Sequence, residues 1–403
     1  MDEQLTIDLP GNREPWLVDF KVRFREFFLA CRESKLKRVV LIYDAPNTSS
    51  FRYRVYNVKQ ALDGNGQIHI SYFYRYELPS LKPYVSKIDL MVFSRCQWTL
   101  EIQDIYTLLK NNRIPIVFDI DDLFCDLDQI QLITNTLNVE LNSYDAYTYW
   151  SASISRTFMV AKMADYYIAT NAYLGQKLSR QFQGKPYYVI ENSLNREQVQ
   201  ISEEICRKKR LHTPDKSRFI MGYFSGTPSH INDFKIIAPE IMELLHNFPE
   251  MILRVVGFMD FPEYMNKMRE QGRIEFRPLV DFMELQVEMG QVDLNIVPLV
   301  DNEFTNCKSE LKFFEASVVD TLTCATPIYS YAHSIRHGST GFLCRPGEWY
   351  RTIADIFQGR YDTEKILAEA KTYCLDRYYG ANFKNQALQV FNDILTRSRK
   401  QIC

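Results

Sequence analysis

Residues 306–316 read Asn-Cys-Lys-Ser-Glu-Leu-Lys-Phe-Phe-Glu-Ala and follow a short apolar run that predicts a buried strand. The stretch itself predicts a helix. Lys308 and Ser309 would lie at the start of that helix, where free backbone N–H groups and the positive end of the dipole favour an anion. Helical spacing would place Lys312 and Glu315 on the same side as Ser309. The stretch therefore predicts an α/β fold with a phosphate-binding helix.

The Lys–Glu spacing also has a plainer interpretation, because such pairs on a helix are often solvent-exposed and weak. The residues that follow favour the binding interpretation. Residues 326–330 (Thr-Pro-Ile-Tyr-Ser) predict a strand, and residues 337–343 (His-Gly-Ser-Thr-Gly-Phe-Leu) predict a turn. This order of Glu-Ala, short turn, Pro-initiated strand and Thr-Gly-Phe-Leu turn resembles the nucleotide-sugar site of retaining glycosyltransferases of family 4, which have the GT-B fold.

The resemblance covers residues 222–344 well and the first half of the chain more weakly. It implies that Glu315 matches the second glutamate of the family's paired-glutamate motif, which binds the nucleotide ribose. The first glutamate falls on Cys307, so the chain departs from the majority form of the family. It is more similar to a subgroup that reads Lys-Ser-x-x-Lys-x-x-Glu here, associated with polysaccharide and rhamnan-type synthesis.

Length and composition predict an ordinary two-domain globular protein. The 403 residues exceed what one hydrophobic core usually serves, and 46% are hydrophobic and 24% charged. A net charge of −2 argues against a nucleic-acid partner. The nine cysteines show no Cys-x-x-Cys spacing, which predicts reduced thiols and no zinc site. With no signal peptide and no run of 18 apolar residues, we expect a cytoplasmic protein.

Residues 20–38 predict a basic amphipathic helix. Phe20, Phe24, Phe27 and Phe28 recur at helical spacing, and Lys and Arg outnumber Glu around them. One hypothesis is that this helix contacts the anionic inner face of a membrane, where a lipid-linked acceptor would be found. The alternative is that the Phe stripe packs on the domain behind it.

Short apolar strands alternate with helical stretches along the chain, which predicts parallel sheets covered by helices on both faces. We expect two Rossmann-like domains facing one another across a cleft, residues 1–195 and 196–379, joined by a polar linker within residues 192–215. The resemblance adds a C-terminal helix, residues 380–403, that returns to the first domain. The expected strands are 39–43, 68–73, 88–93, 114–118, 166–169 and 187–190 in the first domain and 219–224, 252–256, 274–276, 294–297 and 327–330 in the second.

Ligands of such sheets bind outside the carboxyl ends of the strands, so we expect chemistry in the loops after Tyr43, Phe93 and Phe118. The first of these loops contains Arg52 and Arg54 in the predicted first turn of a helix, where cations oppose the dipole. This placement costs stability unless a negative group lies nearby. A donor diphosphate or an anionic acceptor would supply it, and two solvated arginines are the alternative.

The loop after the fourth expected strand contains Asp119, Asp121 and Asp122, whose ionisation we expect to be coupled and shifted. In a glycosyltransferase these carboxylates would face the acceptor and the reacting sugar. In a haloacid-dehalogenase-type phosphatase, Asp119 would be the nucleophile and Asp121 the general acid, with Mg²⁺ beside them. That fold, however, normally carries the motif on its first strand. A helix cap with spare acids is the third interpretation.

The loop that opens the second domain contains Ser225-Gly226-Thr227, where backbone N–H groups can approach a ligand closely. His230 follows and could donate a hydrogen bond to a phosphate, although a loop histidine is often only a surface residue. The Arg and Lys that the resembling family carries at this loop are missing. Lys308 and Lys312 would replace them.

These observations predict a metal-independent, retaining glycosyltransferase of the hexosyl or deoxyhexosyl class, without a cofactor. It would move a sugar from a nucleotide-diphosphate sugar to a glycan or lipid-linked acceptor in surface polysaccharide synthesis. The alternatives are the Mg²⁺-dependent phosphatase and a non-catalytic nucleotide-sugar-binding partner protein. The predicted catalytic residues are Asp119, Asp121, Lys308 and Lys312, and the predicted donor-binding residues are Glu315, Ser309, Gly226, Thr227, His230, Arg52 and Arg54.

Overall fold

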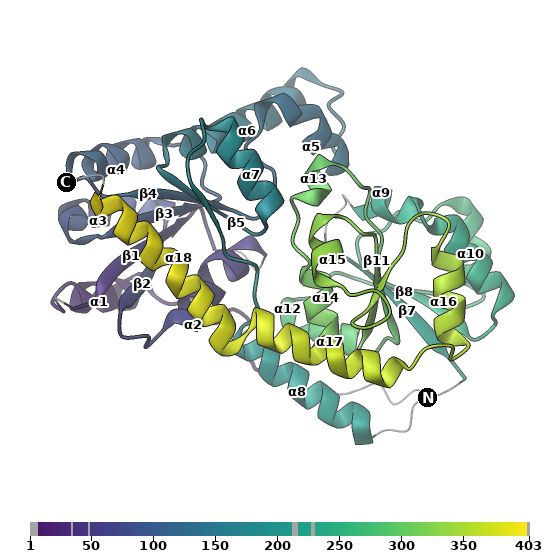
Figure 1. The fold of residues 1–403 in the computed structure, drawn as a ribbon. Coiled ribbons are helices and arrows are strands. Elements are labelled where there is room, and N and C mark those ends of the chain that lie inside the picture. Colours follow the sequence, from purple (N-terminus) through teal and green to yellow (C-terminus); the bar gives the residue numbers. More distant parts are fainter. Residues whose placement is uncertain (1–6, 34, 47–48, 212–216, 227–229, 401–403) are drawn as a thin grey trace.

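The computed structural model of the chain describes residues 7–33, 35–46, 49–211, 217–226 and 230–400. Two six-stranded parallel sheets lie side by side, each with helices on its faces (Figure 1). The first sheet has the order β2-β1-β3-β4-β5-β6 and the second β12-β11-β10-β7-β8-β9. The expectation of an α/β chain with two parallel sheets is confirmed.

The strands of the first sheet are β1 (Lys37–Tyr43), β2 (Ile68–Tyr74), β3 (Leu90–Ser94), β4 (Ile116–Ile120), β5 (Tyr166–Ala169) and β6 (Tyr187–Val189). Those of the second are β7 (Phe219–Ser225), β8 (Met251–Gly257), β9 (Ile274–Arg277), β10 (Leu294–Val297), β11 (Leu322–Ala325) and β12 (Phe342–Leu343).

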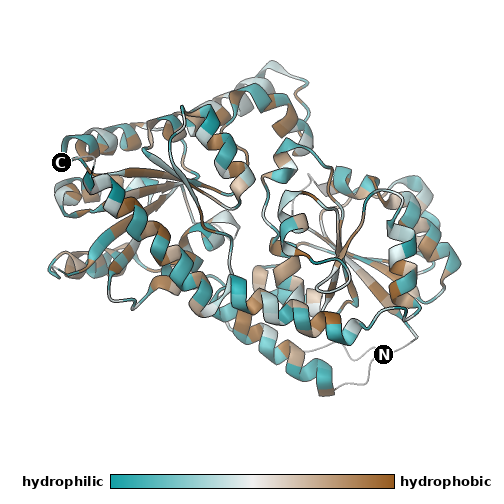
Figure 2. Cartoon of the chain, in the orientation of Figure 1, coloured by the Kyte–Doolittle hydropathy of each residue, from teal (hydrophilic) through white to brown (hydrophobic). Residues whose placement is uncertain are grey.

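Both faces of the first sheet are buried, which explains why its strands are continuous apolar runs. Along β1, Val39 and Leu41 belong to one hydrophobic core, whereas Val40 and Ile42 belong to another on the opposite face. The strands are accordingly the most hydrophobic elements of the chain, and the outer helices are mixed (Figure 2).

The strand expected at residues 327–330 is wrong. The strand is β11, which ends at Ala325, and the chain then enters α15 (Tyr329–Ser334). Pro327 has no N–H to donate to a sheet ladder, and the hydroxyl of Thr326 instead accepts a hydrogen bond from Leu299 N at 3.0 Å. Proline therefore ends the strand here and does not begin it.

The helix after β10 also begins later than expected. Residues Glu303–Asn306 form a short helix, α13, and α14 runs from Leu311 to Ser317. Lys308 and Ser309 consequently lie in the connection between the two helices. They are held beside the first sheet by Asn171, whose Nδ2 donates to the backbone oxygens of Asn306 and Lys308 at 3.1 Å each.

The expected linker contains a helix, α8 (Arg196–Leu211). Its buried face packs on α12 (Phe282–Gly290), where Ile205 lies against Gly290 and Ser202 accepts a hydrogen bond from Gln286 at 2.9 Å. Polar residues on this buried face interrupt the apolar period, which is why the helix is hard to recognise in the sequence.

The C-terminal helices connect the two halves of the molecule. After α17 (Thr363–Tyr378) comes α18 (Gly380–Lys400), which crosses to the first sheet (the yellow helix in Figure 1). Phe383, Ala387 and Phe391 of α18 share a hydrophobic core with Val58 of α2 (Asn57–Leu62). This contact ties the end of the chain to the first half.

The N-terminal helix α1 (Phe20–Ala30) packs on the first sheet through most of its Phe stripe. Phe27 is fully buried, and the rings of Phe20 and Phe24 contact Phe73 of β2. Phe28 alone of the four is exposed. Among the described residues, no helix has both the length and the apolar character needed to cross a membrane. Contact of α1 with a membrane surface stays a prediction.

Candidate active site between the two sheets

The carboxyl ends of β1, β3 and β4 meet the segment of α13 and α14 at the junction of the two halves. Three clusters of polar side chains occupy this junction, and each predicted catalytic carboxylate belongs to one of them. In each cluster, a residue that follows a strand of the first sheet contacts a residue from the second half directly or through one neighbour.

The first cluster surrounds Asp121 and Asp122. Asp121 accepts hydrogen bonds from Ser50 Oγ at 2.5 Å and from Arg95 Nη1 at 2.9 Å. Arg95 also reaches Asp122 at 3.4 Å, and Lys308 Nζ lies 3.6 Å from the other oxygen of Asp122. Burial alone would raise the pKa of Asp121, but Arg95 and Ser50 outweigh it and hold that pKa below its ordinary value.

The second cluster surrounds Asp119 within β4. Arg54 donates to both carboxylate oxygens of Asp119, and its remaining donors reach the backbone oxygen of Ile190 at 2.6 Å and Asn192 Oδ1 at 3.2 Å. Asn192 in turn donates to Ser309 Oγ at 2.9 Å. Burial raises the pKa of Asp119 despite the neighbouring arginine. The pKa values of the two acids thus shift in opposite directions.

The third cluster surrounds Glu315 on α14, which is 1% exposed. Its Oε1 accepts hydrogen bonds from the hydroxyl of Tyr53 and from Gln198 Nε2 at 3.1 Å, and Arg52 Nη2 lies 3.4 Å away. The Arg52 guanidinium lies 4.6 Å from the ring centroid of Phe282. The other oxygen, Oε2, is buried and accepts no hydrogen bond within the described part of the chain.

The clusters show which negative groups lie beside Arg52 and Arg54. Arg52 and Arg54 are buried, and the negative groups beside them are Glu315 and Asp119 of the same chain. A diphosphate is therefore not needed to explain their placement. Binding of a donor by these arginines stays a prediction.

Lys312 differs from every other cation of the junction. It lies on α14 with its ammonium 5.8 Å from the ring centroid of Tyr223, and across the described residues no carboxylate is within ion-pair distance of it. Burial lowers the pKa of Lys312 to about 8, and the like charge of Lys308 adds to this effect while Asp233 opposes it. A half-buried ammonium without an ion pair is a site that an anion would stabilise.

The loop after β7 is only partly described. Gly226 follows β7 and is exposed, and His230 is the first residue of α9 (His230–Lys235). Thr227 and the side chain of His230 lie outside what the structure describes. The predicted contact of this loop with a diphosphate stays a prediction.

Sequence reasoning missed several members of the clusters. Arg95 follows β3, in a loop where chemistry was expected, but its left-handed backbone (φ 52°), which turns the side chain toward Asp121, has no sequence signal. Tyr53 and Gln198 were missed because aromatic and amide residues at these positions are ordinary helix-surface residues until the two halves come together.

The phosphatase interpretation gains no support from this arrangement. Asp119 lies on the fourth strand of the first sheet along the chain, and both of its carboxylate oxygens accept from Arg54. A nucleophilic carboxylate needs a free oxygen directed at the substrate phosphorus.

Comparison with known proteins finds structures of similar fold but no match in sequence. No protein-family model matches the chain, and no curated protein matches it in sequence. The structure of HepE from Anabaena in complex with UDP has a TM-score of 0.59 at 13% identity, covering 88% of this chain and 100% of that one. Sucrose-phosphate synthase from Thermosynechococcus elongatus has a TM-score of 0.57 at 14% identity, covering 90% and 100%.

A glycosyltransferase from Rickettsia africae gives the same result, with a TM-score of 0.58 at 15% identity over 89% of this chain and 99% of that one. At such identities the likeness concerns the fold alone. The two parallel sheets, the helices around them and the match over nearly the whole length agree with the architecture expected from the sequence. The chain therefore has the GT-B fold.

Proposed function

We propose that the chain is a glycosyltransferase that takes a sugar from a nucleotide-diphosphate sugar, with UDP-sugars the first donors to test. The observation that carries this proposal is Lys312, a half-buried ammonium without an ion pair among the described residues, at the junction of a GT-B fold. A donor diphosphate is an anion of the kind that would stabilise it. Support for UDP comes from HepE, whose structures hold UDP and UDP-glucose.

The proposed reaction breaks the bond between the anomeric carbon and the diphosphate oxygen, and forms a bond between that carbon and an acceptor hydroxyl on the same face. The acceptor proton passes to the departing diphosphate. The contribution of the protein is electrostatic: Lys312, with Lys308 behind it, stabilises negative charge that grows on the leaving group. Closure of the two halves excludes water that would hydrolyse the donor.

Glu315 would hold the nucleotide ribose in this proposal. Its Oε2 is a buried acceptor without a hydrogen bond from any described residue, and a ribose hydroxyl is a donor that would satisfy it. Tyr53 and Arg52 cover Glu315 in the present arrangement, so the first half has to move before the ribose can reach it.

We further propose a retaining enzyme of the family 4 type, hexosyl or deoxyhexosyl specific and acting in surface polysaccharide synthesis in the cytoplasm. In this proposal it needs no metal and contacts the inner face of the membrane through residues 20–38. The support is the Lys-Ser-x-x-Lys-x-x-Glu pattern of residues 308–315 and the surplus of basic residues in that N-terminal segment.

A non-catalytic nucleotide-sugar-binding protein is the second candidate, and Cys307 favours it. Cys307 is fully buried, and burial raises the pKa of its thiol, so it cannot replace a carboxylate that contacts the donor sugar. Release of UDP from a UDP-sugar, measured with and without added acceptors, separates the two candidates. A binding protein would release none.

The first experiment is thermal unfolding of the purified chain with UDP, GDP, ADP and dTDP and their sugars, with and without EDTA. A ligand that binds only the folded state raises Tm. We expect one nucleotide family to raise Tm, with the shift surviving EDTA. The proposal would fail if none of these ligands raised Tm.

A further inference from the structure

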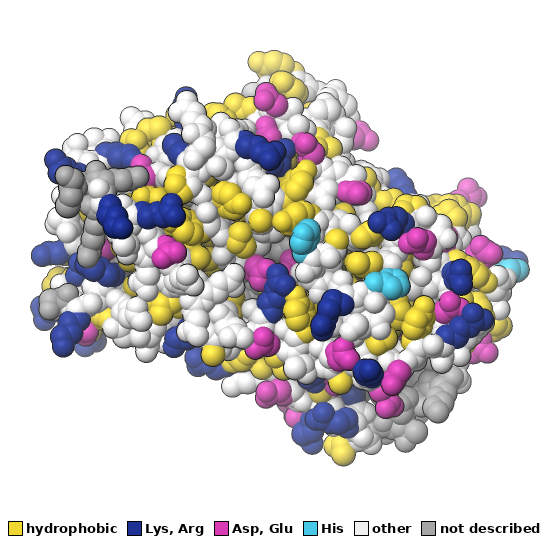
Figure 3. All heavy atoms as spheres, viewed as in Figure 1, with side chains coloured by type: hydrophobic (Ala, Val, Ile, Leu, Met, Phe, Trp, Pro, Cys, Tyr) yellow, Lys and Arg dark blue, Asp and Glu magenta, His cyan; other side chains and the backbone are white. Residues whose placement is uncertain are grey.

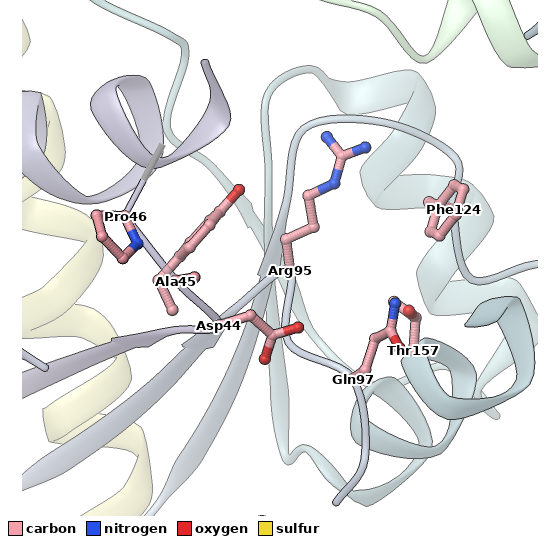
Figure 4. Close-up of a pocket in the computed structure, with 8 residues that line it drawn as sticks. Asp44, Ala45, Pro46, Arg95, Gln97, Phe124 and Thr157 are labelled. Atoms are coloured by element: carbon pink, nitrogen blue, oxygen red, sulfur yellow. The ribbon is translucent and has the colours of Figure 1, made fainter. Parts of the chain in front are cut away.

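A cavity of about 270 Å³ opens beside the first cluster, at the carboxyl ends of β1 and β3. Figure 4 shows Asp44, Arg95 and Gln97 around this space, with Phe124 and Thr157 on the side of α6 (Tyr144–Met163). Arg95 forms a wall of the cavity and at the same time binds Asp121. The cavity is therefore adjacent to the carboxylates proposed to face the reacting sugar.

The polar groups of the cavity suit a ligand rich in hydroxyls. Asp44 has a buried oxygen, Oδ1, that accepts no hydrogen bond within the described residues, although Arg75 Nε lies 3.5 Å away. Burial raises the pKa of Asp44. Arg95 and the second N–H of the Gln97 amide supply donors, and the Thr157 hydroxyl, which donates to Ser153 O at 3.0 Å, can accept. A small apolar wall with a few convergent polar groups is typical of a small-molecule site.

An aromatic surface continues from this cavity along α6. Trp150 precedes Thr157 by two turns and lies on the same side of α6, whereas Tyr147 and Tyr144 come three and six residues before Trp150 and follow one another obliquely around the helix. The ring of Trp150 contacts Phe124 of the cavity wall, with 6.0 Å between centroids. Tyr147 is 52% and Tyr144 83% exposed. We call Tyr144, Tyr147 and Trp150 the aromatic stripe.

The aromatic stripe lies at the end of α6 that reaches toward the second half. There the preceding helix, α5 (Ile130–Thr136), meets the loop before α13, and Asn302 Nδ2 lies 3.4 Å from Thr136 Oγ1. Hydrophobic side chains gather over this end of the molecule (top of Figure 3). From Thr157 to Tyr144 the helix rises about 20 Å, which is longer than a single sugar ring.

The charge of this segment decides what kind of molecule the stripe can bind. No Lys or Arg occurs between Arg113 and Arg156, whereas Asp and Glu do occur. Nucleic acids and anionic lipid surfaces are bound through Lys and Arg, so this surface does not suit them. Exposed Tyr and Trp offer a flat apolar face and a polar edge. Such rings match the apolar faces and hydroxyl edges of uncharged sugars.

We infer that the acceptor is an uncharged oligosaccharide. Its terminal sugar occupies the cavity between Asp44 and Thr157, and its preceding sugars lie along the aromatic stripe. This inference rests on the proposed glycosyltransferase function and adds the acceptor's chemical class.

The test uses the full chain and immobilised gluco-, manno-, galacto- and rhamno-oligosaccharides of two to eight sugars. Vesicles of phosphatidylglycerol and phosphatidylethanolamine form the competing arm. We expect one neutral series to bind, more tightly as it lengthens. The Tyr144→Ala/Tyr147→Ala variant should bind long oligosaccharides about tenfold more weakly, since two ring contacts are lost. The control is Tyr264→Ala, a tyrosine of the second half about as exposed as Tyr147, which should bind as the parent does.

Asp44→Asn tests the cavity separately, because it should weaken short and long oligosaccharides alike. The inference is overturned by vesicle binding that the stripe variant loses, by equal saccharide binding of the parent and the stripe variant, or by no saccharide binding at all. The UDP-induced rise in Tm, measured on the same variants, reports the donor site. If UDP does not raise the Tm of the parent protein, the proposed function is refuted. If UDP raises Tm but no saccharide binds, only this inference is refuted.

Discussion

The carboxyl edges of the two sheets have opposite electrostatic character. At the first edge, Asp119 and Asp121 are buried and each is paired with an arginine, Arg54 or Arg95. At the second edge, Lys312 is half-buried and has no such partner among the described residues. A paired buried charge contributes to a fixed shape, whereas an unpaired one is stabilised by a ligand of opposite sign. We therefore expect substitutions at the first edge to lower stability, and substitutions at the second edge to lower activity.

The largest expected effect on stability is that of Arg54→Ala. It leaves the buried carboxylate of Asp119 without its arginine and should lower the free energy of unfolding by about 3–5 kcal/mol. Urea denaturation measures it, with Arg351→Ala, an exposed arginine, as the control. A loss below about 1 kcal/mol would mean that the Arg54–Asp119 pair does not hold the first edge together.

Lys312→Met should lower activity without lowering stability. Removal of one group that stabilises charge in a transition state costs about 10²–10³ in kcat, so transfer should slow by that factor. Tm should stay equal or rise, because a half-buried charge without a partner is removed. Turnover and Tm are measured beside Lys365→Met, an exposed lysine of α17. Unchanged turnover would remove Lys312 from the mechanism.

Glu315→Gln should weaken UDP binding by about tenfold, because a hydrogen bond to a charged group is lost. Glu315 also holds Tyr53, so the control is Tyr53→Phe, which removes that contact and keeps the carboxylate. Calorimetric titration with UDP measures both variants. If both lose the same affinity, Glu315 acts through the contact between the halves and not through the ribose.

The sequence predicted the strands of the two sheets better than the contacts at the junction between the two halves. The strands are continuous apolar runs because both sheet faces are buried, and each expected strand except 327–330 overlaps an observed one. Lys308 and Ser309 lie between α13 and α14 and not in the helix start where the sequence placed them, and their role in binding stays a prediction. Contacts such as Arg52 to Glu315 join residues 263 positions apart, and no local pattern reports such a distance. Gln198, which donates to Glu315 from 117 positions away, was missed for the same reason.

The free energy of unfolding should depend on pH through Glu310, a buried carboxyl group of the second half. Burial, with the charge of Glu191, raises its pKa to about 7, although Tyr378 donates a hydrogen bond to it at 2.6 Å. The folded protein thus binds this proton more tightly than the unfolded chain does. The stabilisation is complete below the unfolded pKa and is lost as pH rises through about 7.

Unfolding in urea at pH 5 and pH 8 measures the effect of Glu310. Relative to Glu310→Gln, the parent protein should lose about 2 kcal/mol between these two values. The variant keeps an acceptor for Tyr378 and cannot ionise, so it isolates the charge. A constant difference between the two proteins would show that Glu310 does not titrate in this range.

The smallest expected effect is that of Lys308→Ala. Lys308 and Asp122 are each about one-fifth exposed and 3.6 Å apart, so the pair should contribute less than about 1 kcal/mol to stability. Its loss should slow transfer less than Lys312→Met does, since Lys308 already has a carboxylate beside it. The reverse order would place the leaving group nearer Asp122 than Tyr223. The first edge would then bind the anion, and the contrast between the two edges would no longer explain function.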